Sequence, residues 1–173
     1  MKTLISYILL GVVLFSCSDI SSKSAFEGTA EKHTTAPVGT IPAESIYMLS
    51  DTFQNQYNKQ TTLSSFAGKP TVVGMIFTNC TYACPRLTAD IKEIEEKLKD
   101  ANGKVNFLLI SFDSQRDTAA QLKKFATNSN LDKNFTLLHG SEEAVRTLSV
   151  LLNVQFEKDA EGNFSHSNII SVL

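Results

Sequence analysis

The sequence predicts an α/β fold with a largely parallel sheet, formed by one domain over residues 43–173. Two apolar runs, 71–77 and 105–112, are nearly continuous, which is typical of strands buried on both faces. Helical patterns with one apolar face follow both runs, and strands that alternate with helices indicate βαβ units. The length of 173 residues fits a single domain.

Composition and charge exclude several classes of protein. The 16 basic and 18 acidic residues give a net charge of −2, which argues against a nucleic-acid-binding protein. A hydrophobic fraction of 42% is enough to form a core, so the chain is not intrinsically disordered. Three cysteines are too few for a disulfide scaffold, and their odd number leaves one to be explained.

The first cysteine belongs to a predicted targeting segment. Residues 1–16 contain Lys2 and then an apolar run that fits a signal peptide but falls short of the about 20 residues that span a bilayer. Ser16 before Cys17 resembles the lipobox of bacterial lipoproteins, which implies cleavage before Cys17 and lipid attachment to its sulfur. The alternatives are an ordinary signal peptide and an uncleaved anchor.

A tether follows the predicted lipid anchor. Residues 17–42 are rich in Ser, Thr, Ala and Gly and lack an apolar period, so we expect a flexible connection between the membrane and the domain. Export places Cys80 and Cys84 outside the cytosol, where disulfides persist.

The domain is expected to begin with a β-hairpin. Residues 45–49 and 52–56 have the pattern of short strands, Asn58-Lys59 forms a turn, and residues 61–66 continue the chain. Gly68-Lys69-Pro70 separates this extension from the buried strand at 71–77.

Three helices and three further strands complete the prediction. The first helix ends at Asn102-Gly103 and carries an apolar stripe of Leu87, Ile91, Ile94 and Leu98. The strand at 105–112 leads to a helix at 118–128, with Leu122, Phe125 and Ala126 inward, and then to a strand at 135–138. Ser141 caps the next helix, whose buried stripe is Val145, Leu148 and Leu152, and residues 168–173 form the last strand.

The remaining cysteines lie in the loop after the first buried strand, at the sheet edge where reactive groups gather in α/β proteins. Pro85 is favoured at the first position of a helix, which would make Cys84 the N-cap and leave Cys80 in the loop. Because a helix N-terminus favours negative charge, we expect a stabilised Cys84 thiolate.

Two thiols at this spacing can form a disulfide or bind one metal ion. Thiolates select Cu(I), zinc or iron–sulfur clusters, and two cysteines are too few for a Cys₄ cluster or for zinc bound by two cysteine pairs. Copper accepts two thiolates and one imidazole. His166, just before the last strand, is the favoured imidazole, His139 at a strand end remains open, and His33 lies in the tether.

Residues 78–85 closely resemble the T-x-C-x-x-x-C-P loop of the Sco/SenC family. Three further segments match the family pattern in order and spacing, and the resemblance covers residues 45–173: Gly68-Lys69-Pro70, Ser111-Phe112-Asp113 with Arg116-Asp117-Thr118, and His166-Ser167. The resemblance implies a thioredoxin-like fold and a membrane-anchored copper protein that helps to metallate the dinuclear copper centre of cytochrome c oxidase.

The resemblance also implies site residues and partners. Cys80, Cys84 and His166 correspond to the copper ligands, for Cu(I) or Cu(II), and Asp113 would support the site by hydrogen bonding or charge, with a helix cap as its alternative role. The partners would be the copper-site subunit of the oxidase and a copper donor protein. The domain would lie on the extracytoplasmic, periplasmic side of the cell envelope, held by the lipid on Cys17.

Thiol–disulfide exchange is the alternative function, with Cys80 and Cys84 as catalytic residues that reduce the copper-site cysteines of the oxidase subunit. The three-residue spacer, instead of the two residues of C-x-x-C motifs, lowers this alternative. A purely structural disulfide is the other possibility that the spacing allows.

Two departures from the family pattern stand out. Ser114 replaces a proline that many members have. The family continues after the last strand with a turn, a partner strand and a C-terminal helix, so we expect the strand of Ile169, Ile170 and Val172 to have an unpaired edge and an uncovered face. We therefore expect a lower thermal unfolding midpoint for residues 43–173 than for a version extended by those elements.

Overall fold

The computed structural model describes residues 43–80, 83–101 and 103–173. The predicted signal peptide, Cys17 and the tether lie outside these residues. Within the described part of the chain, no helix has the length and apolar character needed to cross a membrane.

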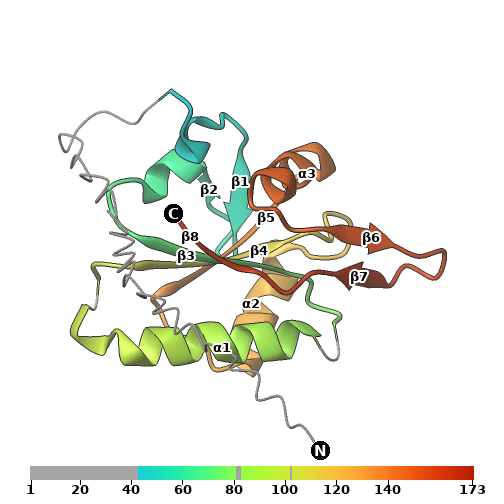
Figure 1. The fold of residues 1–173 in the computed structure, drawn as a ribbon. Helices are drawn as coiled ribbons and strands as arrows, with labels where there is room; N and C mark the ends of the chain where they lie inside the picture. The colour runs from blue at the N-terminus through green and yellow to red at the C-terminus, as the bar shows by residue number, and fades with distance from the viewer. Residues whose placement is uncertain (1–42, 81–82, 102) are drawn as a thin grey trace, which may run out of the picture. The chain divides into compact units, whose positions relative to one another are not determined.

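A six-stranded mixed sheet forms the centre of the domain, in the order β2-β1-β5-β4-β3-β8 (Figure 1). Its parallel centre consists of β3 (Thr71–Ile76), β4 (Asn106–Ser111) and β5 (Phe135–Gly140). Antiparallel strands flank this centre: β1 (Phe53–Asn55) with β2 (Gln60–Thr61) on one side and β8 (Ile170–Val172) on the other. The predicted α/β class and N-terminal hairpin are confirmed.

Helices cover both faces of the sheet. Helices α1 (Ala83–Lys97) and α2 (Ala119–Asn128) lie on one face, and α3 (Glu142–Leu151) lies on the other (Figure 1). Hydroxyl groups cap α2 and α3: Thr118 accepts from the Gln121 N–H, and Ser141 accepts from the Ala144 N–H.

The part of the hydrophobic core between α1 and the parallel strands positions the start of α1. All six residues of β3 are buried, as the apolar run predicts. Gly74 lets the helix approach, because a Cβ there would lie 2.7 Å from Ile91 Cδ1. The close contact brings the first turn of α1, which contains Cys84, to the carboxyl end of β3.

The N-terminal segment differs from the prediction at two places. Residues 46–48 form a short 3-10 helix, η1 (Ile46–Met48), instead of a strand, because the Ser45 hydroxyl accepts the Tyr47 N–H and starts a turn. A second 3-10 helix, η2 (Leu63–Phe66), follows β2 and buries Leu63. A third, η3 (Lys99–Ala101), follows α1, so the α-helix ends earlier than predicted.

A second sheet of two strands was not predicted. β6 (Phe156–Lys158) and β7 (Phe164–His166) form an antiparallel hairpin that extends away from the main sheet (Figure 1). Each strand has three residues, too few for a clear alternating pattern, although Gly162 with φ +83° marks the turn. His166 therefore lies on a strand, where the sequence predicts a loop.

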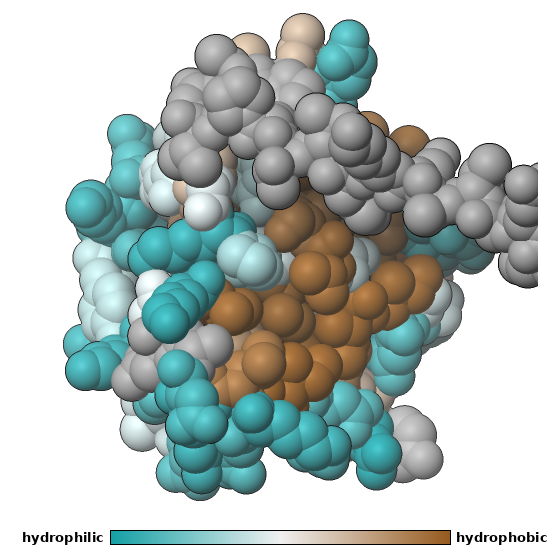
Figure 2. Space-filling view, turned by 60° about the vertical axis from the view of Figure 1, so that its left-hand side comes forward, coloured by the Kyte–Doolittle hydropathy of each residue, from teal (hydrophilic) through white to brown (hydrophobic). Residues whose placement is uncertain are grey.

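Strand β8 is at the edge of the main sheet. It pairs with β3, and no other strand among the described residues pairs with it, as predicted. The Val172 side chain is 70% exposed. Figure 2, which brings the left-hand side of Figure 1 forward, shows apolar side chains gathered on this side of the molecule and bordered by hydrophilic ones.

Candidate metal centre

Cys80, Cys84 and His166 meet at one point. Their sulfur and imidazole ligand atoms all lie within 4.8 Å of one another. The Cys84 sulfur is 3.5 Å from His166 Nε2, although the two residues are 82 positions apart in the sequence. Among the described residues this is the cluster of His, Cys, Asp and Glu whose geometry could hold a metal ion.

The cysteines are held by the end of β3 and the start of α1. The Cys80 N–H donates to the Phe77 carbonyl at 3.2 Å, and the Phe77 N–H donates to the Cys84 sulfur at 3.4 Å. The Cys84 N–H donates in turn to the Cys80 sulfur at 3.2 Å. These local hydrogen bonds hold the two sulfurs close together.

The prediction that Cys84 is the N-cap of the helix is wrong. Helix α1 begins at Ala83, so Cys84 lies inside the first turn, where its side chain is completely buried. The first four N–H groups of a helix have no intrahelical acceptor, so Pro85 is tolerated at the third position as well as at the first.

Burial raises the pKa of the Cys84 thiol, and the hydrogen bond from the Phe77 N–H offsets this only in part. The sequence predicts a lowered pKa for this thiol instead, because it shows that Cys84 lies at a helix N-terminus but does not show how deeply the side chain is buried. A bound cation would compensate the buried negative charge, so metal binding and loss of the thiol proton are coupled here.

His166 presents its Nε2 atom to the cysteines. Its Nδ1 atom lies 3.2 Å from the Ser167 carbonyl oxygen, which can only accept a hydrogen bond. Nδ1 therefore carries the proton, and the Nε2 lone pair faces the Cys84 sulfur.

An aromatic cluster supports the imidazole ring. The ring centroid of His166 lies 5.0 Å from that of Phe112 and 6.1 Å from that of Phe77. Phe156 and Phe164 of the hairpin pack against Phe112 at centroid distances of 5.0 and 5.1 Å. The hairpin is thus joined to the end of β3 and to the residue after β4 by ring packing.

Asp113 does not belong to the cluster of ligand atoms. Its side chain is 1% exposed and forms an ion pair with Arg116. Thr118 caps α2, so the helix-cap alternative for Asp113 is wrong.

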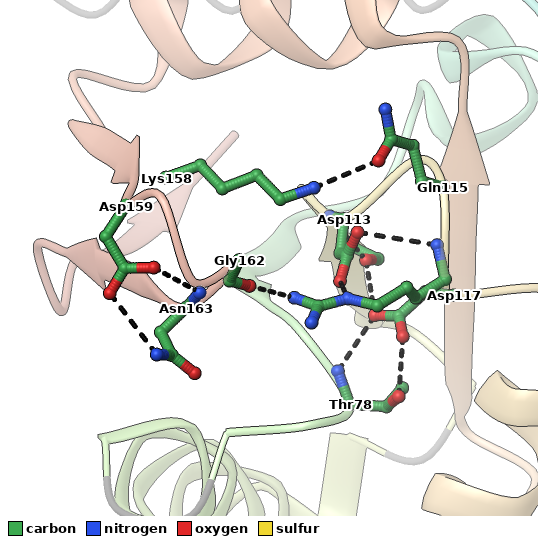
Figure 3. Close-up of polar contacts among 10 residues, drawn as sticks. Thr78, Asp113, Gln115, Asp117, Lys158, Asp159, Gly162 and Asn163 are labelled. Atoms are coloured by element: carbon green, nitrogen blue, oxygen red, sulfur yellow. Dashed lines mark hydrogen bonds and ion pairs between the residues drawn. The ribbon is translucent and has the colours of Figure 1, made fainter.

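Asp117 is the residue whose role the sequence reasoning missed. Its carboxylate accepts hydrogen bonds from the N–H and hydroxyl of Thr78, at 2.8 and 2.5 Å, and from the Ser111 hydroxyl at 2.6 Å (Figure 3). The signal in the sequence is the Arg116-Asp117-Thr118 segment, which belongs to the family pattern.

His139 does not reach the sulfurs. It lies on β5, its Nε2 atom is buried without a hydrogen-bond partner among the described residues, and burial lowers the pKa of its imidazole. Of the two histidines that the sequence left open, the structure brings His166 to the cysteines.

The model of one protein family, SCO1/SenC, matches residues 45–173, which is most of the chain. The chain belongs to the SCO1/SenC family. The match covers the whole described domain from η1 onward, including the cysteine loop and the hairpin that carries His166.

The SCO1 protein homolog of Bacillus subtilis (strain 168) is 39% identical over 94 residues, which are 54% of this chain and 49% of the relative. The aligned part thus spans about half the length of that curated relative.

Solved structures are similar over a larger share of the chain. A SCO1/SenC family lipoprotein from Bacillus anthracis str. Ames is 28% identical with a TM-score of 0.65, covering 70% of this chain and 74% of that one. Bradyrhizobium japonicum ScoI with copper bound is 26% identical with a TM-score of 0.64, covering 71% and 80%. The thioredoxin-like fold is confirmed.

The donor set of this SCO1/SenC site consists of two sulfur atoms and one imidazole nitrogen. Soft sulfur donors favour Cu(I), and imidazole binds copper in both of its common oxidation states. The same pair of sulfurs can also be oxidised to a disulfide. The site can therefore bind a soft metal ion or exchange electrons through its thiols.

Proposed function

We propose that this protein is a copper-binding metallochaperone of the cell envelope that assists assembly of the dinuclear copper centre of cytochrome c oxidase. The convergence of Cys80, Cys84 and His166 carries the proposal, because two sulfurs and one imidazole form a three-coordinate donor set suited to copper. Membership of a family with a copper-bound member, ScoI, supports it.

In the proposed mechanism copper is the cargo of the protein. Cys80 and Cys84 supply the two sulfurs and lose their protons when copper binds, and His166 supplies Nε2 as the third donor. Cys84 and the aromatic rings exclude water on the buried side, while Cys80 and His166 are only half-buried. Incoming cysteines of the recipient subunit can therefore displace the ligands one at a time.

Membership of the family supports the proposed partners and location. The Sco family is described as one of cytochrome c oxidase assembly proteins, which supports the copper-site subunit as recipient and a copper donor protein as source. The lipoprotein from Bacillus anthracis supports a lipid anchor, for which Cys17 is the proposed residue after removal of residues 1–16. The tether 17–42 would hold the domain, residues 43–173, on the periplasmic side.

Copper titration of the full chain, purified in detergent under reducing conditions, tests the ligands. In competition with a Cu(I) chelator we expect one copper per chain, no binding after Cys84→Ser, and unchanged binding after the control change Cys17→Ser. His166→Ala should lower the affinity, whereas His139→Ala should not. No binding by the wild type, or equal losses in both histidine variants, would contradict the proposal.

Cell fractionation tests the anchor. Cys17→Ser should move the protein from the membrane fraction to the soluble fraction, whereas Cys80→Ser should leave it in the membrane. Retention of Cys17→Ser in the membrane would show that another segment anchors the chain.

Thiol–disulfide exchange remains the second candidate. The observation in its favour is the hydrogen bond from the Cys84 N–H to the Cys80 sulfur, because it helps to stabilise a thiolate on the more accessible residue. Reduction of a disulfide peptide with the copper-site cysteines by metal-free protein would support it, if Cys84→Ser abolishes the reaction and the chelator titration shows no copper binding.

A further inference from the structure

One turn of the chain contacts both halves of the site. The turn 112–118 connects β4 to α2 and contains two aspartates, Asp113 and Asp117, that are each 1% exposed. Neither carboxylate belongs to the ligand cluster. Figure 3 shows this turn between the cysteine loop, at Thr78, and the hairpin turn, at Asp159, Gly162 and Asn163.

Asp117 holds the cysteine loop. It accepts two hydrogen bonds from Thr78, which is two residues before Cys80, and a third from the Ser111 hydroxyl at the end of β4. A buried carboxylate with three donors fixes its partners firmly, because hydrogen bonds to a charged group are stronger than those between neutral groups. Asp117 thereby connects the segment that follows β3 to the end of β4.

Asp113 acts on the hairpin through Arg116. The Arg116 Nε atom pairs with the Asp113 carboxylate, and its Nη2 atom donates to the Gly162 carbonyl at 2.5 Å. Gly162 lies in the turn between β6 and β7, four residues before His166. Lys158 adds a second contact from the hairpin, to the Gln115 side chain at 3.0 Å.

The ligands of the site come from segments far apart in the sequence, so nothing local fixes the distance between sulfur and imidazole. We infer that the turn 112–118 is a two-sided clamp for the metal site, in which Asp117 positions the cysteine loop and the Asp113–Arg116 pair positions the hairpin that carries His166. This inference rests on the proposed function, because it assigns positioning residues to the same three ligands.

Hydrogen exchange of the metal-free full chain tests the two sides separately. Arg116→Lys keeps the charge, but a single ammonium group cannot bind Asp113 and Gly162 as the guanidinium does. We expect about tenfold faster exchange at the Asp159 and Ser167 amides of the hairpin, with the Thr78 and Cys84 amides unchanged. Asp117→Asn should instead speed exchange at the Thr78 and Cys84 amides and leave the Asp159 and Ser167 amides unchanged.

Two further variants keep this test clear. Thr78→Val removes the hydroxyl that donates to Asp117. This variant is used in place of Asp117→Asn if the latter does not fold. Ser114→Ala is the matched control, since the Ser114 hydroxyl lies in the same turn and is buried without a hydrogen-bond partner among the described residues. It should leave exchange unchanged at all four amides.

Copper affinity separates positioning from general stability. Arg116→Lys should lower the affinity about tenfold in the wild-type background and have no effect in the His166→Ala background, because it acts through that ligand. Asp117→Asn should lower the affinity in both backgrounds.

The outcomes distinguish the clamp from the function. If the wild type binds no copper, the proposed function fails, and the exchange data still decide whether the clamp exists. Copper binding by the wild type, with exchange and affinity unchanged in Arg116→Lys and Asp117→Asn, would overturn the clamp alone. Equal acceleration of both sets of amides by each variant would overturn it as well.

Discussion

The two halves of the site are built differently. The cysteine half consists of Cys80 and Cys84 with the end of β3 and the start of α1, and local hydrogen bonds and the buried core fix it. The histidine half is the β6–β7 hairpin. Among the described strands, none of the main sheet pairs with this hairpin. Aromatic packing and Arg116 attach it instead. The cysteine half should therefore depend on global stability, and the histidine half on a few contacts.

The largest effect is expected from the core below the cysteine half. Ile91→Ala removes a fully buried side chain that packs against Gly74, and it should cost about 2–5 kcal/mol of unfolding free energy. Urea unfolding followed by circular dichroism measures this. Leu98→Ala, one residue after the end of α1 and 38% exposed, is the control and should cost much less. Equal losses would show that burial does not set the difference.

A smaller loss of stability, with a selective effect on the site, is expected in the hairpin. Phe164 is half-buried and packs against Phe77 and Phe112, so Phe164→Ala should cost about 1–3 kcal/mol. Copper affinity should nevertheless fall about tenfold, because the support of His166 is lost. Chelator competition measures the affinity, with the exposed Tyr57→Ala as control. A stability loss as large as that of Ile91→Ala would contradict the division into two halves.

His139, which belongs to neither half of the site, contributes to the pH dependence of the protein's stability. Burial lowers the pKa of His139 below its ordinary value of 6.5, so the folded protein favours the neutral imidazole. As pH falls below 6.5, the unfolded chain takes up a proton at this site more readily than the folded protein, and stability decreases. Urea midpoints between pH 7.5 and 5 should fall less for His139→Gln than for the wild type. Parallel curves would contradict this.

The smallest effect is expected on the exposed face of α1. Arg86 is two residues from Cys84 but forms only an exposed ion pair with Asp90 at 3.0 Å. Arg86→Ala should therefore cost about 0.3–0.5 kcal/mol and leave copper affinity unchanged. Thermal unfolding and chelator competition provide both values. A tenfold loss of affinity would assign Arg86 to the cysteine half.

The longer strands and helices could be predicted from the sequence. The apolar runs of β3 and β4 and the helices α2 and α3 were predicted to within a few residues, because burial and a hydroxyl cap determine them locally. The β6–β7 hairpin was not predicted, because strands of three residues are too short to show an alternating pattern. The shift in the Cys84 pKa was predicted with the wrong sign, because a sequence shows the helix start but not the depth of burial.

The sequence by itself determined that two thiols, four residues apart, lie at the carboxyl end of a buried strand. Only the tertiary structure brought His166 to them and left His139 apart, and only it showed that Asp117 binds the cysteine loop. The physical reason is the range of the forces involved. Spacing and capping act over a few residues, whereas the contact between Cys84 and His166 joins positions 82 residues apart through the packing of a hairpin onto the sheet.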